Sequence, residues 1–266
     1  MLMKIGLIQN YVKLGDIENN KSLFFSEIAA LLKESPDFII LPEMWLTGFD
    51  YENIFKFSEN TFNIIKELQN ILSDDTLIVS SLPEQSNSKV FNTIFVFNKS
   101  KIIAKYRKNF LFSPLREDIY FEKGNDITVF ENKGTKIGLH TCYEIRFPEL
   151  FRLSTYNGAE LFFVPAIWPA GKKHHWLTLI KARAIENQAF IVGCNANKIS
   201  TKNKEVACGY SVVIDPWGNE VFIADEEPLS TTVSLDMSKV KEVRDTIPSL
   251  KDAMEVFEIN KKPYKG

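Results

Sequence analysis

The alternation of strand-length apolar runs with amphipathic segments constrains the fold of this chain more than any other feature. The runs at 38–41 and 135–139 each have the length of one strand. The segment 16–34 instead has a helical pattern behind a candidate N-cap, Asp16. A sheet built from such strands needs helices over its outer faces, so the pattern predicts a layered α/β fold. The apolar positions of that helical pattern are Phe24, Ile28, Leu31 and Leu32.

The same pattern covers the rest of the chain without a linker, repeat or low-complexity block. We therefore expect a single domain over residues 1–266, with the C-terminal tail from about 245 used for packing or oligomer contacts. The segment 112–123 is expected to be a loop. Further helices are expected at 61–72, 148–156 and about 174–188. Strands are expected at 4–9, 38–41, 77–81, 90–97, 101–106, 127–130, 135–139, 160–165, 190–194, 210–214, 220–223 and 231–235.

Composition excludes several functional classes. With 266 residues, 45% of them hydrophobic, the chain can build one large core. A net charge of −2 and a pI near 6.0 give no electrostatic case for binding nucleic acid or an anionic membrane. Three cysteines without paired spacing favour a reducing compartment, and the N-terminus has no signal-peptide pattern. We expect a soluble cytoplasmic protein.

A cysteine at a strand-to-helix junction is the strongest candidate for chemistry. Cys142 comes shortly after the run 135–139, and 147–149 is typical of the first turn of a helix. A thiol at such a junction is expected to be exposed and to face backbone N–H groups that have no partner. The nearby helix start favours thiolate over thiol, as a nucleophile requires.

Two other segments carry the groups that a cysteine nucleophile needs. Glu43 ends the second apolar strand in Leu41-Pro42-Glu43, where it can accept a proton. Lys108 lies among aromatic residues in the segment 105–112, where it can supply a positive charge. Taken alone, each would be read as a solvated charge, and only the order and spacing of all three segments favour a site.

These segments closely resemble the nitrilase (carbon-nitrogen hydrolase) superfamily, whose signature is a Glu-Lys-Cys triad. The resemblance covers nearly the whole chain and ends at the Asp215-Pro216-Trp217-Gly218 turn. One motif alone would be weak, but five in the family's order are strong. The matching stretches are Leu41-Pro42-Glu43 with Thr47-Gly48-Phe49, Tyr106-Arg107-Lys108 with Leu111-Phe112, Cys142 to Glu149, His175-Trp176, and Lys181 to Gln188.

The resemblance implies a fold and a mechanism. The fold would be a four-layer α-β-β-α sandwich, in which two sheets face each other and helices cover both. Cys142 would be the nucleophile, Glu43 its proton acceptor and Lys108 the cation beside the oxyanion. The backbone N–H of Tyr143 is the expected second oxyanion donor. The reaction would pass through a thioester and would need no metal and no cofactor.

The family often has a second glutamate near the triad, which helps to orient the substrate and the lysine. Glu117 is the better match in this chain, and Glu122 is its competitor.

The remaining cysteines and the histidines have structural interpretations. Cys194 is expected to fill the core, and Cys208 to be a loop thiol or a strand start. A Cys-His protease pair or a zinc site would need patterns that the sequence lacks. We expect His140 to pack in or beside a strand and His175 to lie at a helix start.

Within the superfamily, the chain looks most like the omega-amidase branch, which hydrolyses the terminal amide of 2-oxoglutaramate and 2-oxosuccinamate. The resemblance lies in the cysteine motif, Trp168-Pro169, His175-Trp176 and 183–188. Related enzymes often have a small polar residue and an arginine around the Trp-Pro pair, and here the segment 165–173 departs from that pattern.

A substrate with a carboxylate at one end needs an arginine or lysine in the pocket. Arg146 is the first candidate, with Lys172 or Lys173 behind it. The alternative for Arg146 is an ion pair with Glu144 or Glu149 that fixes the loop. Trp168 is expected to wall the pocket, its alternative being a core residue.

Other functions stay open at this point. Another branch of the superfamily would hydrolyse N-carbamoyl amines, aliphatic amides or nitriles. A member of a different class would be a non-catalytic sensor or assembly partner that keeps the fold. Family members commonly pair through helices, so the expected partners are a small amide substrate and further copies of this chain, as a homodimer or larger homo-oligomer.

Overall fold

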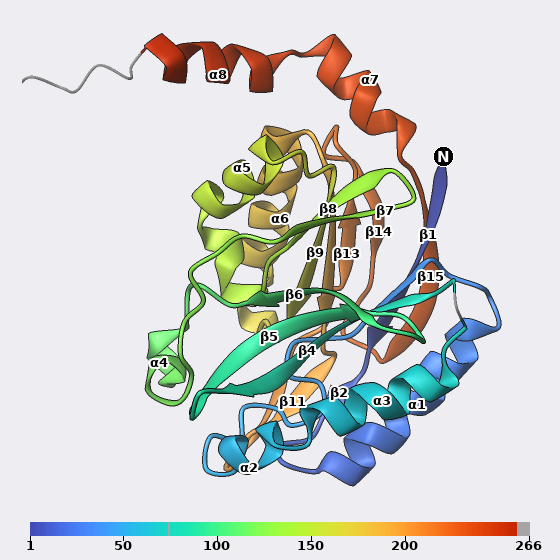
Figure 1. Cartoon of the computed structure of the whole chain (residues 1–266), viewed down its shortest axis with the longest axis vertical. Coiled ribbons are helices and arrows are strands. Elements are labelled where there is room, and N and C mark those ends of the chain that lie inside the picture. The colour runs from blue at the N-terminus through green and yellow to red at the C-terminus, as the bar shows by residue number, and fades with distance from the viewer. Residues whose placement is uncertain (74, 260–266) are drawn as a thin grey trace, which may run out of the picture.

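Two six-stranded sheets form the centre of the molecule in the computed structural model, which describes residues 1–73 and 75–259. The first sheet has the order β15-β1-β3-β4-β5-β6 (Figure 1). The second has the order β14-β13-β10-β9-β8-β7. The strands of the first sheet are β1 (Leu2–Gln9), β3 (Phe38–Ile40), β4 (Leu77–Ser86), β5 (Lys89–Phe97), β6 (Ile102–Arg107) and β15 (Leu229–Asp236). Those of the second are β7 (Val129–Asn132), β8 (Thr135–Leu139), β9 (Leu161–Ala166), β10 (Phe190–Asn195), β13 (Val212–Ile214) and β14 (Glu220–Ile223).

Helices cover the outer face of each sheet. The largest, α1 (Ile17–Leu32) and α3 (Thr61–Ile71), pack with the outward residues of β3, β4 and β5 in one apolar cluster. Helices α5 (Pro148–Tyr156) and α6 (Lys173–Asn187) pack in another with β9, β10 and β13. The third cluster lies between the sheets, where the ring centres of Phe38 and Phe163 are 5.0 Å apart. The layer order is the predicted four-layer α-β-β-α sandwich.

Strand direction brings the functional segments to one end of the sheets. In the first sheet β3 and β4 are parallel, and β6 runs in the same direction because two antiparallel pairings separate it from β4. In the second sheet β8, β9 and β10 are parallel. Glu43 follows β3, Lys108 follows β6 and Cys142 follows β8, so each lies just beyond the carboxyl end of its strand, where α/β folds commonly place their sites.

Several short elements were not predicted. The segment 112–123, expected to be a loop, contains the 3₁₀ turn η1 (Ser113–Leu115) and the helix α4 (Glu117–Tyr120). Each is a single turn, too short for a periodic pattern to reveal it. The others are a small sheet of β12 (Glu205–Ala207), β11 (Lys198–Ser200) and β2 (Tyr11–Val12), the helix α2 (Ile54–Ser58), and two 3₁₀ turns, η2 (Cys142–Arg146) and η3 (Ala170–Lys172).

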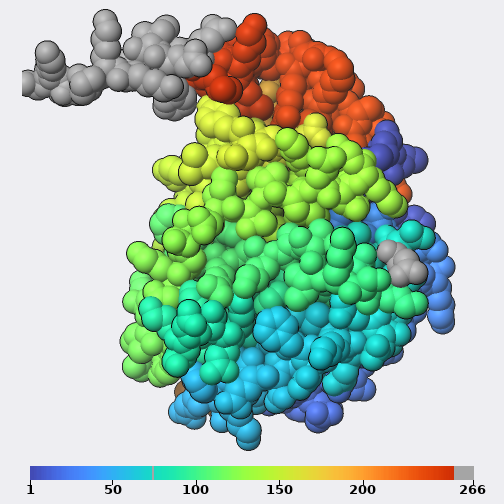
Figure 2. Space-filling model, viewed as in Figure 1, coloured from blue at the N-terminus to red at the C-terminus, as the bar shows by residue number. Residues whose placement is uncertain are grey.

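The C-terminal region forms α7 (Ser238–Thr246) and α8 (Ser249–Ile259), which extend past one end of the body (Figures 1 and 2). Arg244 of α7 donates to the carbonyl oxygens of Ala159 and Gln188, at 2.8 and 3.3 Å. The Gln188 amide in turn donates to the carbonyl oxygen of Ile247 at 2.6 Å. These contacts tie the start of the predicted tail to the body, whereas its last part, 260–266, lies outside the described residues. No helix within the described ranges is long and apolar enough to cross a membrane.

Candidate active site

Glu43 lies in the interior, where the two sheets meet. Its side chain is 1% exposed, and its backbone N–H donates to the carbonyl oxygen of Ala166, the last residue of β9, at 3.3 Å. One carboxylate oxygen, Oε1, accepts hydrogen bonds from Lys108 Nζ and from the Asn92 amide, both at 2.8 Å. A residue that could have been a solvated charge is therefore a buried group with fixed partners.

Lys108 is buried between two carboxylates. Its Nζ donates to Glu43 at 2.8 Å and to both oxygens of Glu117, at 2.9 and 2.8 Å. Its backbone N–H donates to the carbonyl oxygen of Asn92 in β5, which fixes the chain just past β6. Burial opposes the positive charge, but the carboxylates of Glu117 and Glu43 outweigh burial and hold the pKa of Lys108 well above its ordinary value. The lysine is therefore a permanent cation in the site.

The structure brings Glu117, and not Glu122, to the lysine. Glu117 is 1% exposed at the start of α4, and its Oε2 also accepts from the Phe112 N–H at 2.7 Å. The Glu122 side chain is 37% exposed and pairs with Lys89 on the surface. The competitor in the sequence thus points away from the buried cluster.

Cys142 begins the turn η2 in a strained backbone conformation. Its φ is 41°, in the left-handed region that costs a non-glycine residue about 1–3 kcal/mol. The expectation of an exposed thiol was wrong: the residue is 8% exposed, because it packs within the cluster under α5 and α6. Its Sγ lies 3.6 Å from the carbonyl oxygen of Ile167, and the Glu43 carboxylate is close enough to act on the thiol electrostatically. The turn therefore directs the sulfur toward Glu43.

The expected stabilisation of the thiolate by a helix start is also wrong for the resting protein. Burial raises the pKa of Cys142 well above its usual value, the Glu43 carboxylate adds to this, and Lys108 only partly offsets it. Burial likewise raises the pKa of Glu43, so that its carboxylate is a stronger base than an exposed one. A thiol beside a buried carboxylate can pass its proton directly to that carboxylate during attack.

The backbone N–H of Tyr143 lies at the start of η2, before the first hydrogen bond of the turn. That bond runs from the Glu144 N–H to the carbonyl oxygen of Thr141 at 2.8 Å. The N–H groups at the first positions of a turn have no carbonyl partner within it, so the Tyr143 N–H is available as a donor. The role of this group as the second oxyanion donor stays a prediction.

Two polar residues of the site were missed in the sequence. The Asn92 amide donates to Glu43 at 2.8 Å and to Glu117 at 3.0 Å, and so joins the two carboxylates. The completely buried Glu144 accepts from groups beside both Lys108 and Cys142. The sequence did contain a signal for each residue. Asn92 is a polar residue inside an otherwise apolar strand, and Glu144 is a charged residue within the cysteine motif.

Arg146 and Trp168 lie together beside the cysteine turn. The Arg146 guanidinium is 4.8 Å from the centre of the Trp168 ring and 3.3 Å from His175 Nδ1. Among the described residues no salt bridge joins Arg146 to Glu144 or Glu149, the two partners of the alternative interpretation, and the Glu144 carboxylate is bonded to other groups. Trp168 is 5% exposed, shares a cluster with Cys142 and donates from Nε1 to the carbonyl oxygen of Lys172 at 2.9 Å. Lys172 and Lys173 are exposed.

The other histidines and cysteines are placed as expected or deeper. His140 is buried, its Nε2 lies 3.1 Å from Ser154 Oγ, and burial lowers its pKa to about 3. It therefore faces Ser154 as a neutral ring. Cys194 is completely buried between the sheets, as predicted, and Cys208 is a buried thiol in the loop after β12, one of the two placements expected for it.

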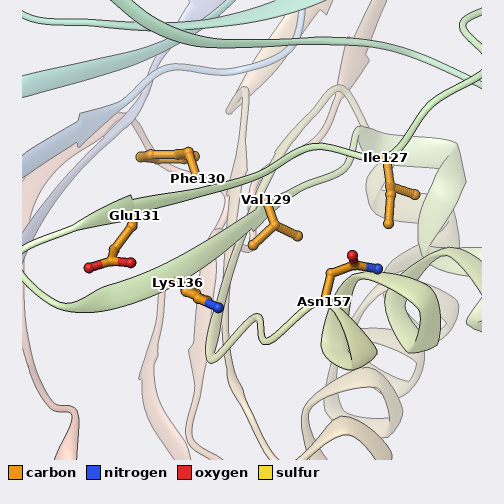
Figure 3. Close-up of a pocket in the computed structure, with 6 residues that line it drawn as sticks. All are labelled: Ile127, Val129, Phe130, Glu131, Lys136 and Asn157. Atoms are coloured by element: carbon orange, nitrogen blue, oxygen red, sulfur yellow. The ribbon is translucent and has the colours of Figure 1, made fainter.

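A separate cavity of about 370 Å³ lies at the β7–β8 hairpin, near the end of α5 (Figure 3). None of Glu43, Lys108, Glu117 and Cys142 lines it. The buried cluster is accordingly distinct from this surface cavity. The lining residues are Ile127, Val129, Phe130, Glu131, Lys136 and Asn157.

Comparison with known families matches residues 4–245 to the carbon-nitrogen hydrolase model. The chain belongs to the carbon-nitrogen hydrolase family. Among curated carbon-nitrogen hydrolase relatives, the 2-oxoglutaramate amidase of Bacillus subtilis is 34% identical over 263 residues, which cover 95% of this chain and 98% of that protein. The 2-oxoglutaramate amidase of Paenarthrobacter nicotinovorans is 34% identical over 81% of this chain and 78% of its own length.

Solved structures of carbon-nitrogen hydrolases share the fold. Saccharomyces cerevisiae Nit3, a member of branch 10 of the nitrilase superfamily, superposes with a TM-score of 0.82 at 27% identity, over 93% of this chain and 94% of Nit3. XC1258 from Xanthomonas campestris, a superfamily protein with an arsenic adduct in its active site, gives a TM-score of 0.84 at 26% identity, over 95% and 97% of the two chains. The predicted superfamily and fold are thereby confirmed.

Proposed function

We propose that this carbon-nitrogen hydrolase cleaves the terminal amide of a small 2-oxo dicarboxylic acid monoamide, such as 2-oxoglutaramate or 2-oxosuccinamate. The products are the 2-oxo acid and ammonia. The observation that carries the proposal is the buried cation of Lys108 between Glu43 and Glu117, beside the Cys142 thiol. Similarity to the two 2-oxoglutaramate amidases supports this choice of substrate.

The first step forms a bond between Cys142 Sγ and the amide carbon. Glu43 takes the thiol proton as the sulfur attacks, and the carbonyl π electrons move onto the oxygen. Lys108 Nζ and the Tyr143 N–H stabilise the negative oxygen that results. Because the site is buried, these groups act in a low-dielectric environment, where their electrostatic interactions with the oxyanion are stronger than in water.

The second step breaks the carbon-nitrogen bond. The protonated Glu43 returns its proton to the amide nitrogen, ammonia leaves, and a thioester to Cys142 remains. Glu43 then takes a proton from water as that water attacks the thioester, which releases the acid and restores the thiol. Glu117 holds Lys108 in place throughout, through the bonds at 2.9 and 2.8 Å.

Arg146 is the proposed partner of the substrate carboxylate, and Trp168 the wall of the pocket. Among the described residues the Arg146 guanidinium contacts the Trp168 ring and the His175 imidazole, and no salt bridge pairs it with a carboxylate there. Arg146→Ala should therefore raise KM for 2-oxoglutaramate far more than KM for a neutral amide. An equal loss on both substrates would contradict the carboxylate role.

The deciding experiment measures ammonia release from 2-oxoglutaramate beside glutamine, an N-carbamoyl amine and a simple nitrile, with Cys142→Ala as the control. We expect release from 2-oxoglutaramate that depends on Cys142. Turnover of one of the other substrates alone would keep the mechanism and reject the 2-oxo amide. No release from any substrate by folded protein would favour the non-catalytic sensor.

A second candidate substrate is a larger amide. The deaminated glutathione amidase of Escherichia coli O157:H7 is 34% identical over 180 residues, which cover 66% of this chain and 65% of that protein. Deaminated glutathione therefore belongs in the same assay. A higher kcat/KM for it than for 2-oxoglutaramate would replace the first candidate.

We also propose that the protein acts in the cytoplasm as a homodimer or larger homo-oligomer. Leu153 of α5 and Ile185 of α6 are 51% and 50% exposed, which gives the outer helices an apolar surface. The α8 helix extends from the body and can reach a second copy (Figure 1). Light scattering on the full chain and on a chain ending at residue 247 tests this, and a monomeric full chain would contradict it.

A further inference from the structure

Glu144 is a completely buried carboxylate that accepts hydrogen bonds from two separate segments. Its Oε1 accepts from the Tyr106 hydroxyl at 2.8 Å and from the N–H groups of Asn109 and Phe110, at 2.7 and 3.2 Å. Its Oε2 accepts from the Thr141 N–H at 2.8 Å. Four donors thus converge on one side chain that takes no part in the proposed bond changes.

These donors lie on either side of the reacting groups. Tyr106 and Asn109 flank Lys108 in the chain, and Thr141 directly precedes Cys142. Because β6 belongs to the first sheet and β8 to the second, the carboxylate connects the two sheets at the site. A single side chain thereby joins the segment that carries the cation to the turn that carries the nucleophile.

The nucleophile turn needs such a connection because its backbone is strained. Cys142 has a φ of 41°, and a strained conformation persists only where its surroundings enforce it. Glu144 closes the turn twice, since its N–H donates to the Thr141 carbonyl at 2.8 Å and its Oε2 accepts from the Thr141 N–H. Without the carboxylate, the turn can relax and shift the sulfur.

We propose that Glu144 is a positioning residue whose carboxylate sets the placement of Cys142 relative to Lys108, an inference that rests on the proposed function. Glutamine has the same shape, but one of its terminal atoms is a donor. If its oxygen stays with the three donors of the lysine segment, its NH₂ group faces the Thr141 N–H, and the turn loses its tether. A misplacement of about 1 Å can lower a rate about 10²-fold.

The test compares Glu144→Gln with Glu84→Gln. Glu84 of β4 is a matched control because it is 3% exposed and accepts from Thr93 at 3.0 Å and from Arg107, the neighbour of Tyr106 in β6, at 2.8 and 3.0 Å. For each folded variant, kcat and KM for 2-oxoglutaramate and the rate of Cys142 alkylation by iodoacetamide are measured. We expect Glu144→Gln to lower kcat about 10²-fold with little change in KM, and Glu84→Gln to change either by less than about threefold.

A kcat within about threefold of wild type in folded Glu144→Gln protein would overturn the proposal, even if its melting temperature fell. If that variant does not fold, Tyr106→Phe removes one donor and keeps the three backbone N–H groups. A loss of about tenfold in kcat then supports positioning, and an unchanged kcat rejects it.

The alkylation rate separates this proposal from the proposed function. If wild-type protein hydrolyses none of the amides, the function fails, yet Cys142 can still be alkylated. Alkylation about tenfold slower in Glu144→Gln, but not in Glu84→Gln, supports positioning in that case too. Equal alkylation rates in all three proteins would reject it.

Discussion

At the scale of single residues, the site is defined by buried ionisable groups that compensate one another. Glu43, Lys108 and Glu117 are each 1% exposed, and isolated charges at such depth would be strongly unfavourable. The bonds from Lys108 to both carboxylates supply the compensation. Removing one partner leaves a buried charge without its counter-charge, which for a buried pair typically lowers the free energy of unfolding by about 3–5 kcal/mol. A substitution in this cluster is therefore expected to affect both its proposed catalytic role and the stability of the fold.

Replacing Lys108 with an uncharged residue should affect both the activity and the stability of the protein. We expect Lys108→Met, which has a similar volume but no charge, to lower kcat/KM about 10²–10³-fold, because the oxyanion loses its cation. Lys101→Ala, on an exposed residue of the turn before β6, is the control and should leave kcat/KM unchanged. Steady-state ammonia release and thermal melts measure the two effects. A loss of less than tenfold in folded Lys108→Met protein would reject the oxyanion role.

Glu144 should make stability depend on pH. Burial raises the pKa of Glu144 from 4.5 to about 7, although the Tyr106 hydroxyl, backbone N–H groups and Lys108 oppose the shift. The folded state therefore binds this proton more tightly than the unfolded state does. The stabilisation is present below 4.5 and is lost as the pH rises through about 7.

Urea unfolding at about pH 5 and about pH 8 tests this dependence. The difference in unfolding free energy between wild type and Glu144→Gln should be larger at the lower pH, because only wild type loses the contribution on going to the higher pH. Comparing the two proteins at each pH cancels the pH dependence of stability that comes from other groups, such as Glu84, whose pKa is lowered. A difference that grows toward high pH would contradict the raised pKa.

At the scale of secondary-structure elements, helix ends follow local rules that are independent of the site. Asp16 is the N-cap of α1, as the sequence suggested, and its side chain accepts from the Asn19 N–H. Helix α5 starts with Pro148 at its first position, where a missing N–H costs nothing. Helix α1 packs on the outer face of the first sheet, so its stability can be changed without touching the buried cluster.

Removing the cap of α1 should destabilise the protein without lowering activity. Asp16→Ala is expected to reduce the unfolding free energy by about 0.5–2 kcal/mol, because the first turn loses its acceptor. Asp16→Asn keeps an acceptor and should stay close to wild type. Chemical denaturation measures the change, and kcat/KM should be the same for all three proteins. A drop in kcat/KM at full folding would show that α1 is coupled to the site.

At the scale of the whole molecule, the site exists only because the two sheets pack face to face. Glu43 and Lys108 follow strands of the first sheet, and Cys142 follows a strand of the second. The apolar layer between the sheets, which includes Phe38 and Phe163, sets their separation. Packing of this layer should therefore determine both global stability and the distance between nucleophile and cation.

A cavity in the apolar layer between the sheets should lower the stability of the fold and also change the activity of the site. Phe163 is completely buried, so Phe163→Ala is expected to cost about 3–5 kcal/mol of unfolding free energy. Phe163→Leu leaves a smaller cavity and should cost less. Thermal and urea unfolding give the stability, and kcat of the folded fraction reports on the site. A cost below about 1 kcal/mol for the alanine variant would contradict tight packing between the sheets.

Local pattern was sufficient for most of the long elements and for the order of the motifs, although α7, α8 and the short turns and strands were not predicted. The bounds of α5, β8 and β14 are those predicted, and most of the other predicted helices and strands differ from the prediction by one to a few residues. Glu43, Lys108 and Cys142 could be chosen from their motifs because each follows a strand in a recognisable local context. Hydrophobic periodicity and turn residues act over a few positions, so the sequence by itself determines them.

Only the tertiary structure decided which groups meet and how deeply they lie. Glu117 and Glu122 are five residues apart in one segment, yet one bonds to Lys108 and the other pairs with Lys89 on the surface. The burial that raises the pKa of Cys142 comes from α5, α6 and β9, which follow it in the chain. Asn92 joins Glu43 to Glu117, and Glu144 joins the segment after β6 to the turn after β8. Burial and the distances between charges depend on neighbours that are distant in the sequence, so the local sequence pattern cannot reveal them.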